Sequence, residues 1–555
     1  MNGAGGNSTR LMFDDDDDLN NGTLLSSIMF SGASLILILV LFKVIYERWV
    51  TPLSKVPGPF ANSVTSIPMR YHMLRGSLPE FLLGLHRKYG PLVRISPQRV
   101  SIADVDMVRQ VLGSHQFAKT PSYDMPDVLE PNAFSTRLPE LSVERRKQVG
   151  PGFSHRHLSQ MEPKVVQCGV IALRRKIDAI LLRQAQTPSA EATHSTCPSQ
   201  TATLQYYNVF SLITLDTIGI LGFGQNFNAL ATGGHELVST LIRIRIFNYV
   251  TMALPWFKRL PRLLGTRLQT LTRLVAFGQN AIAGRRREIE KNGPCATDLL
   301  QMMLDTGRTQ GDKRAPMSDP QIVSETILHL IAGVDTTSSG LTWTLLLLLH
   351  NPHIKQRLTD EIRREFPPAA NPHVVTFDDC KQKLPYLGAV IAESLRVLSP
   401  APGMLPRLAP ATGIRLGDYF CPPGTWLCCA VGATHLNPKA FDSPHSFDPE
   451  RFMSHDCERA RQNLLAFSNG VRACLGRNLA LVEMHVVLAN LLRDYDLRLP
   501  DDCPPAGLCG NREDVSVGVI PDIPHKTLMT LNPTNPDRDC RVVVSRATQK
   551  LGCAA

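Results

Sequence analysis

Residues 467–476 read FSNGVRACLG and place one cysteine, Cys474, in a loop framed by two glycines. An amphipathic pattern follows directly and predicts a helix, so Cys474 stands at a helix N-terminus. The helix dipole and the unpaired N–H groups there lower a thiol pKa and favour the thiolate, the form that binds metal. Gly470 and Gly476 allow a tight turn and the close approach of a flat ligand, while Arg472 offers a cation to an anionic group. The alternative is a buried, inert cysteine.

The loop resembles the haem-binding loop of the cytochrome P450 family, F-x-x-G-x-R-x-C-x-G, and it matches at Phe467, Gly470, Arg472, Cys474 and Gly476. With residue frequencies of about 5%, such a match arises by chance about once in several thousand sequences of this length. The resemblance implies that Cys474 is the proximal thiolate of haem b (iron protoporphyrin IX) and that the other four residues help to bind this cofactor. Electron donation from the thiolate favours O–O cleavage over reversible oxygen carriage.

A long apolar pattern upstream predicts the central helix. Residues 318–321 offer an S-x-x-Q capping box, and the pattern then continues for about 30 residues, or roughly 45 Å of helix. Polar residues and a glycine interrupt it at 332–337, AGVDTT, where they weaken a helix unless they have a use. The segment resembles the oxygen-activation segment of P450 enzymes, which implies that Gly333 opens a groove and that Asp335 and Thr336 relay protons. The alternative is a kink beside a water-filled pocket.

Two further elements match the family. Glu393 and Arg396 share one helix face at i,i+3 spacing, and Arg451 follows in the sequence PERF at 449–452. They are similar to the E-x-x-R and P-E-R-F elements of P450 enzymes. The resemblance implies a structural Glu393–Arg396–Arg451 network that holds the Cys474 loop, whereas an isolated pair would contribute little.

Haem propionates require cations, and the resemblance implies two arginines that would bind them. Arg407, in a strand-like stretch, matches the propionate-binding arginine of the family, although a surface arginine is the alternative. Arg146 matches a second such arginine. The family usually has Trp or His four residues before it, where this chain has Ser142, and we expect Ser142 to contribute weakly or not at all.

The resemblance covers roughly residues 55–530 and implies one mainly α domain, a triangular prism with a small β region, rather than several modules. We assign this haem domain to residues 60–535 and a C-terminal tail to 536–555. Residues 440–475 are rich in Pro/Gly turns, and 503–515 are expected to form another polar, Pro-containing loop.

The N-terminus predicts a membrane anchor. Residues 24–42 run 19 positions without a charge, about the length that spans a bilayer. Lys43 follows this segment and five aspartates precede it, so the positive-inside rule places residues 1–23 in the lumen and the rest in the cytosol. A cleaved signal peptide is the alternative, but no small-residue cleavage motif follows. A Pro/Gly hinge is assigned to 43–59.

These features predict a single-pass protein of the endoplasmic reticulum membrane with a cytosolic catalytic domain. Asn7 and Asn21 begin glycosylation sequons on the luminal side, although Asn21 is close to the membrane. The 13 cysteines show no CxxC pair or zinc spacing, which favours a reduced compartment. The net charge is +10, with a local −4 in residues 1–23, so the remainder carries +14. With the resemblance, this excess indicates an acidic flavoprotein partner and lipid, and no nucleic acid.

The Asp335/Thr336 pair favours monooxygenation, because relatives that only rearrange peroxides need no proton relay. We therefore predict an oxidoreductase that oxidises a lipophilic molecule with O2 and with electrons from NADPH through NADPH-cytochrome P450 reductase; cytochrome b5 is a further candidate partner. The alternatives are a reductase-independent haem-thiolate isomerase and a non-catalytic haem-binding protein.

The substrate class is inferred from expected pocket walls and from local phrases. Residues 123–134, 330–332 (which include Ala332) and 399–405 are largely apolar, and 241–264 combine apolar and basic residues suited to anionic lipid. The phrases LPRLAP at 405–410 and YFCPPGTW at 419–426 are similar to fungal microsomal P450 enzymes of secondary metabolism. A terpenoid, polyketide or alkaloid scaffold is the predicted substrate.

Overall fold

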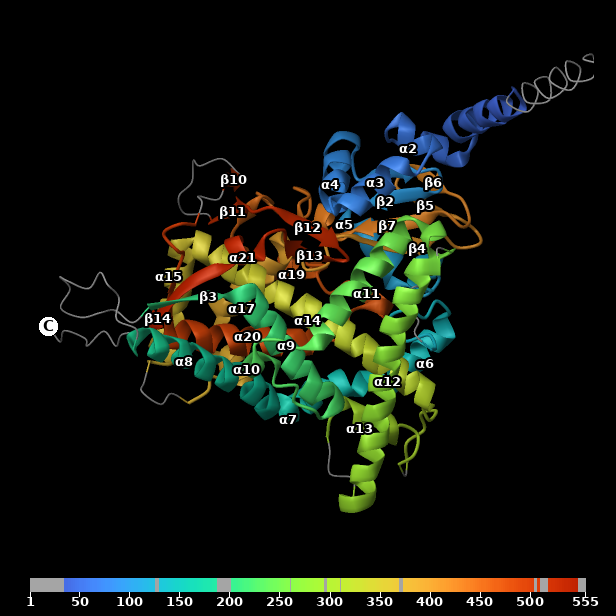
Figure 1. Cartoon of the computed structure of the whole chain (residues 1–555). Coiled ribbons are helices and arrows are strands. Elements are labelled where there is room, and N and C mark those ends of the chain that lie inside the picture. Colours follow the sequence, from blue (N-terminus) through green and yellow to red (C-terminus); the bar gives the residue numbers. More distant parts are fainter. Residues whose placement is uncertain are drawn as a thin grey trace, which may run out of the picture.

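The structure is a computed structural model, and it describes residues 34–124, 129–186, 201–259, 261–293, 297–309, 311–368, 373–503, 507–509 and 518–547. Helices build most of the domain, and small sheets lie toward its edges (Figure 1). This confirms the predicted mainly α class with a small β region.

The helices follow one another along the whole described chain. The α-helices are α2 (Phe60–Val64), α3 (Ile67–Arg75), α4 (Leu78–Tyr89), α5 (Val105–Gly113), α6 (Pro139–Val149), α7 (His155–Val165), α8 (Ala172–Gln186), α9 (Tyr206–Phe223), α10 (Ala229–Thr232), α11 (Glu236–Ala253), α12 (Pro261–Asn292), α13 (Leu299–Asp305), α14 (Asp319–His350), α15 (Pro352–Glu365), α16 (Phe377–Lys383), α17 (Pro385–Val397), α18 (Val431–His435), α19 (Cys457–Asn463), α20 (Arg477–Asp494) and α21 (Pro536–Asp539). The π-helices are η1 (Tyr46–Val50) and η5 (Val166–Ile171). The 3-10 turns are η2 (Pro52–Lys55), η3 (Pro121–Asp124), η4 (Gly150–Phe153), η6 (Pro255–Arg259), η7 (Pro449–Phe452) and η8 (Gly470–Arg472).

The strands form several small sheets. They are β1 (Leu92–Ser96), β2 (Arg99–Ile102), β3 (Thr201–Gln205), β4 (Met404–Leu408), β5 (Ile414–Leu416), β6 (Tyr419–Cys421), β7 (Trp426–Ala430), β8 (Ser446–Phe447), β9 (Tyr495–Arg498), β10 (Gly507–Cys509), β11 (Gly518–Asp522), β12 (His525–Leu528), β13 (Thr530–Pro533) and β14 (Arg541–Arg546). The largest sheet has the order β1-β2-β7-β4, in which β2 and β7 run parallel and the other neighbours run antiparallel.

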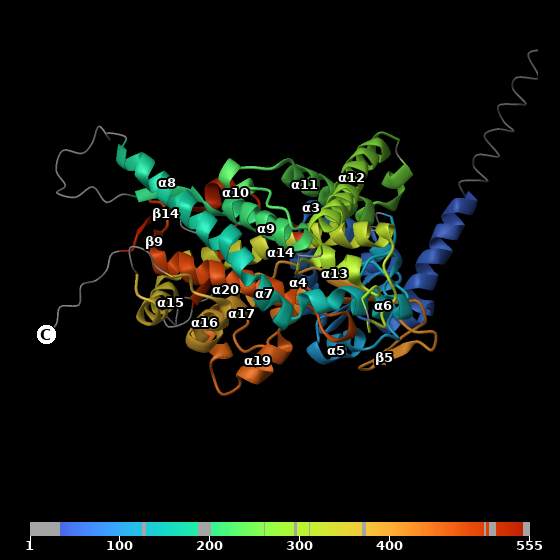
Figure 2. The ribbon, with the colours of Figure 1, turned by 90° about the horizontal axis from the view of Figure 1, so that it is seen from below.

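The central helix α14 forms as the sequence predicts, with 32 residues and a capping box. The Ser318 hydroxyl accepts from the Gln321 amide at 3.4 Å, and the Gln321 side chain accepts from the Ser318 amide at 3.0 Å. The helix runs through the middle of the domain, between α9 and α20 (Figures 1 and 2). A Cβ at Gly340 would lie 3.2 Å from the Met484 sulfur of α20, so this glycine lets the two helices approach closely.

An apolar helix projects from the domain at the N-terminal end of the described chain (Figures 1 and 2). It covers residues 34–45, and its large side chains are exposed, for example Leu37 at 68% and Phe42 at 67%. It includes the second half of the predicted anchor, 24–42. Residues 24–33 of that prediction lie outside the described residues.

Other N-terminal predictions also lie outside the described residues, namely the luminal tail 1–23 and the sequons at Asn7 and Asn21. Within the described chain, α9 is the helix that is long and apolar enough to cross a membrane, but 78% of it is buried in the domain. Its burial identifies α9 as a core helix.

The predicted hinge at 43–59 is wrong in its second half, because this part is docked on the domain. Val56 is buried, and the Pro57 carbonyl accepts a hydrogen bond from the Arg94 amide of β1 at 2.7 Å. A Cβ at Gly58 would meet the Arg94 carbonyl oxygen at 2.5 Å. The glycine therefore serves close packing on β1 rather than flexibility.

The predicted C-terminal tail, 536–555, is wrong for residues 536–546, and residues 548–555 of that prediction lie outside the described residues. β14 pairs with both β3 and β9, and its Val542 and Val544 are buried. The run of three β-branched valines in RVVVSR at 541–546 explains the strand. The folded domain therefore extends at least to residue 546.

Candidate functional site

The Cys474 loop is held against α5 and at the start of α20. The Cys474 amide donates to the Phe467 carbonyl at 2.9 Å. Gly470 has a left-handed backbone (φ 68°), and a Cβ there would lie 2.5 Å from the Gly113 Cα of α5. The need for glycine at this position thus follows from its left-handed backbone, as the predicted tight turn requires, and from the close backbone of α5. Gly476 is the N-cap of α20.

The Cys474 thiol is desolvated by the surrounding protein. Its residue is exposed by surface area, yet desolvation raises the pKa of the thiol. We interpret the exposed surface of Cys474 as facing the interior of the domain, which reconciles the two observations. The amides of Gly476 and Arg477 oppose the rise in pKa. The expected net lowering of the pKa is therefore wrong for the protein alone, because burial outweighs the helix N-terminus; a metal cation at the sulfur would reverse the balance.

Four cations gather beside this loop from distant parts of the chain. They are Lys119, Arg146 of α6, Arg407 of β4 and Arg472 of η8. Each of them donates a hydrogen bond to a neutral oxygen: Lys119 to the Phe134 carbonyl, Arg146 to the Ala473 carbonyl at 2.9 Å, Arg407 to the Tyr123 hydroxyl at 3.0 Å, and Arg472 to the Thr136 carbonyl at 2.9 Å.

The positive charge of this cation cluster is not balanced within the described residues. Desolvation first, and then Arg407, Arg472 and Arg146, hold the pKa of Lys119 well below its usual value. Desolvation, Arg407 and Arg146 lower the pKa of Arg472 to about 10. No carboxylate is among the groups that shift either pKa. Mutual repulsion among buried cations indicates a site for an anionic ligand.

Ser142 lies on α6, one turn before Arg146. It is buried, and its hydroxyl has no hydrogen-bond partner within the part of the chain that the structure describes.

The polar segment of α14 opens to the interior. Ala332 is exposed in the middle of an otherwise buried helix, and the Thr336 hydroxyl donates to the Ala332 carbonyl at 2.7 Å. A Cβ at Gly333 would lie 3.1 Å from Ile218 of α9, so Gly333 also permits helix packing. Ala332 and Thr336 share one face of the helix, because they are four residues apart.

Asp335 has a partner that the sequence did not indicate. Its carboxylate accepts from Arg245 of α11 at 2.8 Å, and Arg245 also donates to the Thr530 hydroxyl at 3.1 Å. Burial raises the pKa of Asp335, and Arg245 opposes this rise. Arg245 was expected to face lipid within 241–264; it is instead buried, because it lies on the inward face of α11 with Leu241.

The structure brings Glu393, Arg396 and Arg451 together. Arg396 donates to both oxygens of Glu393 at 2.7 Å, and Arg451 donates to the same carboxylate at 3.0 Å. The Glu393 side chain has 0% exposure, as has that of Arg396. Arg396 also binds the carbonyls of Pro444 and Ser446 at 2.8 Å, so it ties the segment before η7 to α17.

His435 connects this network to the Cys474 loop. Its Nε2 accepts from the Leu465 amide at 2.8 Å, which places the ring proton on Nδ1, 3.1 Å from the Arg396 carbonyl. Desolvation, assisted by Arg396, lowers the pKa of His435 to about 3 and keeps it neutral. Leu465 lies two residues before Phe467, where the loop begins.

A comparison with protein-family models matches residues 57–522 to the family described as Cytochrome P450. The chain belongs to the cytochrome P450 family. Among its relatives, the cytochrome P450 monooxygenase helB1 of Aspergillus fumigatus is 32% identical and aligns over 91% of this chain and 84% of the relative. The monooxygenase helB3 of the same fungus is 33% identical over 94% and 98% of the two chains. ABA2, a cytochrome P450 monooxygenase of Pyricularia oryzae, is 30% identical over 86% and 90%.

The chain is therefore a cytochrome P450 monooxygenase, an oxidoreductase of a family that binds haem b through a cysteine thiolate. The residues of this P450 fit that cofactor. The Cys474 thiol is desolvated by the surrounding protein, and unbalanced cations suited to two propionates lie beside it. Within the described residues no group of three or more His, Cys, Asp or Glu could hold a bare metal ion, whereas haem iron needs only one protein thiolate.

Sequence reasoning missed three residues of this P450 site, namely Lys119, Arg245 and His435. Lys119 and His435 stand alone in loops or short elements, where no periodic pattern marks them. Arg245 had a signal: it follows the apolar Leu241 by one helical turn, which places both on the buried face of α11.

Proposed function

We propose that Cys474 is the axial ligand of haem and that this P450 oxidises a lipophilic small molecule of fungal secondary metabolism with O2 and NADPH. The observation that carries the proposal is the desolvated thiol of Cys474 beside the unbalanced cation cluster. The fungal relatives support the secondary-metabolite class. Deletion in the native host, followed by a search for the accumulated precursor, tests it.

Different residues would bind different parts of the cofactor. The Cys474 sulfur would bind the iron, while Arg146, Arg407, Arg472 and Lys119 would bind the propionates. When bound, haem b supplies the oxygen and electron chemistry that side chains alone lack. The network of Glu393, Arg396, Arg451 and His435 would keep the Cys474 loop in place, a folding role.

Thr336 and Asp335 are proposed to transfer protons. The Thr336 hydroxyl is bonded to its own helix, and rotation about its side chain would direct it to the open face at Ala332. The Asp335 carboxylate is paired with Arg245. We therefore propose that Asp335 exchanges a proton only when this ion pair opens. Arg245 would thus position Asp335 rather than take part in catalysis.

Thr336→Ala is expected to uncouple NADPH use from product formation. Without the hydroxyl, protons are delivered at the wrong place, and peroxide is released while the yield of product per NADPH falls about 10-fold or more. Product, peroxide and NADPH are measured with a diflavin reductase. Thr342→Ala is the matched control, since Thr342 makes the same kind of bond to Ser338 at 2.7 Å farther along α14. Unchanged coupling in the Thr336 variant would contradict the proton role.

We propose electron delivery by a membrane-bound diflavin reductase, supported by the family and by the basic excess of the chain. Turnover that proceeds without NADPH and reductase would instead favour the isomerase alternative. A non-catalytic haem protein would show no substrate oxidation under either condition.

We also propose that the chain is anchored in the endoplasmic reticulum membrane with its catalytic domain in the cytosol. The exposed apolar helix at 34–45 supports this, as do exposed apolar side chains on the neighbouring α3, Ile67, Tyr71 and Leu74. The full chain is expected to sediment with membranes, and removal of residues 1–45 should release a large part of it. A full chain that stays in the soluble fraction, as the shortened chain should, would argue against the anchor.

A further inference from the structure

A buried polar cluster lies on α14, about two turns before the polar segment. Glu325 has 0% exposure and His329 8%. The Glu325 carboxylate accepts from the Ala133 amide at 2.8 Å and lies 3.5 Å from the Arg145 Nε of α6. His329 Nε2 lies 4.0 Å from the second Glu325 oxygen, and its ring packs on Phe153 with 5.1 Å between centroids.

The hydrogen-bonding capacity of the cluster is incomplete. Arg145 Nε, Glu325 Oε2 and both ring nitrogens of His329 are buried and have no hydrogen-bond partner among the residues that the structure describes. Buried polar atoms are nearly always paired, and water completes the pairing where protein groups do not. Four such atoms at one place indicate bound water between α6 and α14.

The charge states of the cluster favour proton exchange. Burial raises the pKa of Glu325 to about 8, although Arg145 and the Ala133 amide oppose it. Burial lowers the pKa of His329 to about 4, so His329 is neutral and its contact with Glu325 is not an ion pair. Arg145 is the charged group that faces Glu325 from α6, His329 faces it from α14, and η4 contributes the neutral Phe153.

The cluster shares a helix face with Thr336. At about 100° per residue, Glu325, His329, Ala332 and Thr336 fall within an arc of about 60°. His329 and Thr336 are separated by about 10 Å along the axis, too far for direct contact. Ala332 lies between them and is exposed, so there is space for water along this face.

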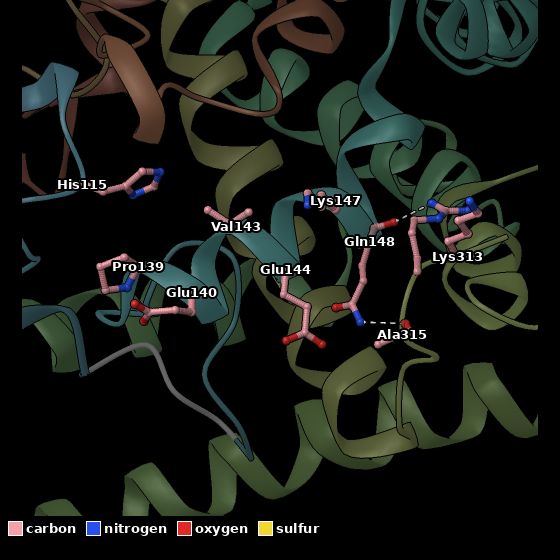
Figure 3. Close-up of a pocket in the computed structure, with 10 residues that line it drawn as sticks. His115, Pro139, Glu140, Val143, Glu144, Lys147, Gln148, Lys313 and Ala315 are labelled. Atoms are coloured by element: carbon pink, nitrogen blue, oxygen red, sulfur yellow. Dashed lines mark hydrogen bonds between the residues drawn. The ribbon is translucent and has the colours of Figure 1, made fainter.

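A cavity of about 700 Å³ lies between α6 and residues 313–315 (Figure 3). Gln148 is part of its wall. The Gln148 side chain accepts from Arg145 at 2.9 Å and donates to the Ala315 carbonyl at 2.9 Å. One side chain, Gln148, therefore connects the wall of the cavity to Arg145 of the buried cluster.

We propose that Glu325 and His329, with water at their unpaired atoms, form a proton-holding site that supplies Thr336 along α14 and is refilled from this cavity. Glu325 Oε2 gives its proton to water, His329 takes a proton on one ring nitrogen and releases one from the other, and water carries it to the Thr336 hydroxyl. Solvent from the cavity then reprotonates the Glu325 carboxylate. The inference rests on the proposed role of Thr336.

The test compares Glu325→Gln and His329→Gln with the haem-loaded wild type. Gln at 325 keeps the acceptor for the Ala133 amide but holds no exchangeable carboxyl proton. In the wild type, the yield of product per NADPH should fall as pH rises through about 8, the pKa of Glu325. Both variants should show yields about 10-fold lower, and the Glu325 variant should lose this pH dependence. Asp319→Asn, an exposed carboxylate at the start of α14, is the matched control and should behave as wild type.

A second readout needs no turnover. Infrared absorption of the resting protein should contain a protonated carboxyl band that disappears as pH rises through about 8. This titrating band should be absent in Glu325→Gln and present in Asp319→Asn and His329→Gln. Burial also raises the pKa of Glu483 well above its usual value, so a separate carboxyl band from Glu483 should remain in all variants. If the Glu325 variant does not fold, loss of coupling in His329→Gln with the band retained still supports the inference, and wild-type coupling there overturns it.

Thr336→Ala, measured alongside, separates the two claims. If Thr336→Ala uncouples while Glu325→Gln and His329→Gln keep the wild-type yield and pH profile, the inference alone is wrong. If Thr336→Ala remains coupled, the proposed role of Thr336 is wrong. Absence of a titrating band in the wild type also overturns the inference.

Discussion

Glu393→Gln is expected to prevent the chain from accumulating as a folded, haem-loaded protein. The substitution removes the negative charge that Arg396 and Arg451 share, and Arg396 is then left buried without a counter-ion. Breaking a buried ion pair in this way costs about 3–5 kcal/mol. Because domains are stable by only about 5–15 kcal/mol, such a loss takes a large part of the free energy of unfolding. Haem content and thermal unfolding of the purified protein measure the effect.

Glu450→Gln is a matched control for this prediction. Glu450 lies beside Arg451 in η7, and its ion pair with Arg357 is about half exposed on both sides. An exposed pair of this kind contributes about 0–1 kcal/mol, so the control should fold and bind haem normally. Wild-type haem content and unfolding temperature in Glu393→Gln would contradict the structural role of the network.

Cys474→Ser is expected to abolish product formation while the fold persists. Serine is close in size to cysteine, but it offers no thiolate to the iron and therefore removes the electron donation that favours O–O cleavage. The cation cluster is unchanged, so part of the haem should remain bound. Product per minute and haem per chain are measured together, which separates loss of chemistry from loss of the cofactor.

Cys457→Ser serves as the control for the cysteine variant. Cys457 is partly exposed at the start of α19, outside the Cys474 loop, and its replacement should leave turnover unchanged. Equal turnover in the wild type and in Cys474→Ser would contradict the assignment of the ligand.

The parts of the site that follow from short sequence intervals were predictable. The loop around Cys474 combines a cysteine, an arginine and two glycines within ten residues, and the helix after it has a clear period. The capping box of α14 and the i,i+3 pair of Glu393 and Arg396 are equally local, because helix geometry relates residues three or four apart. The family confirms the mainly α fold and the haem cofactor that this loop implied.

The partnerships between distant residues were not predictable. Asp335 and Arg245 are 90 positions apart, and Arg146 and Ala473 are 327 apart. Only the packing of α11, α6 and the Cys474 loop brings these residues together. A single sequence does not show which distant residues come into contact. The glycine at 470 shows the same limit, since its partner is the backbone of α5.

The two errors at the ends of the domain have different causes. The Pro/Gly composition of 43–59 indicates a stiff, irregular segment, but it does not tell whether the segment is free or docked. The strand β14 has a readable signal in its run of valines, but it lies beyond residue 530, where the resemblance to the family motifs ends. Its partners, β3 and β9, come from opposite halves of the chain.

The absorption spectrum of the reduced, CO-bound protein tests the central claim most directly, namely that the Cys474 thiolate holds the haem iron. The wild type should show the red-shifted Soret band that thiolate ligation produces, and Cys474→Ser should lose it while Cys457→Ser retains it. A wild-type spectrum without the shift, or a shift that persists in Cys474→Ser, would contradict the account.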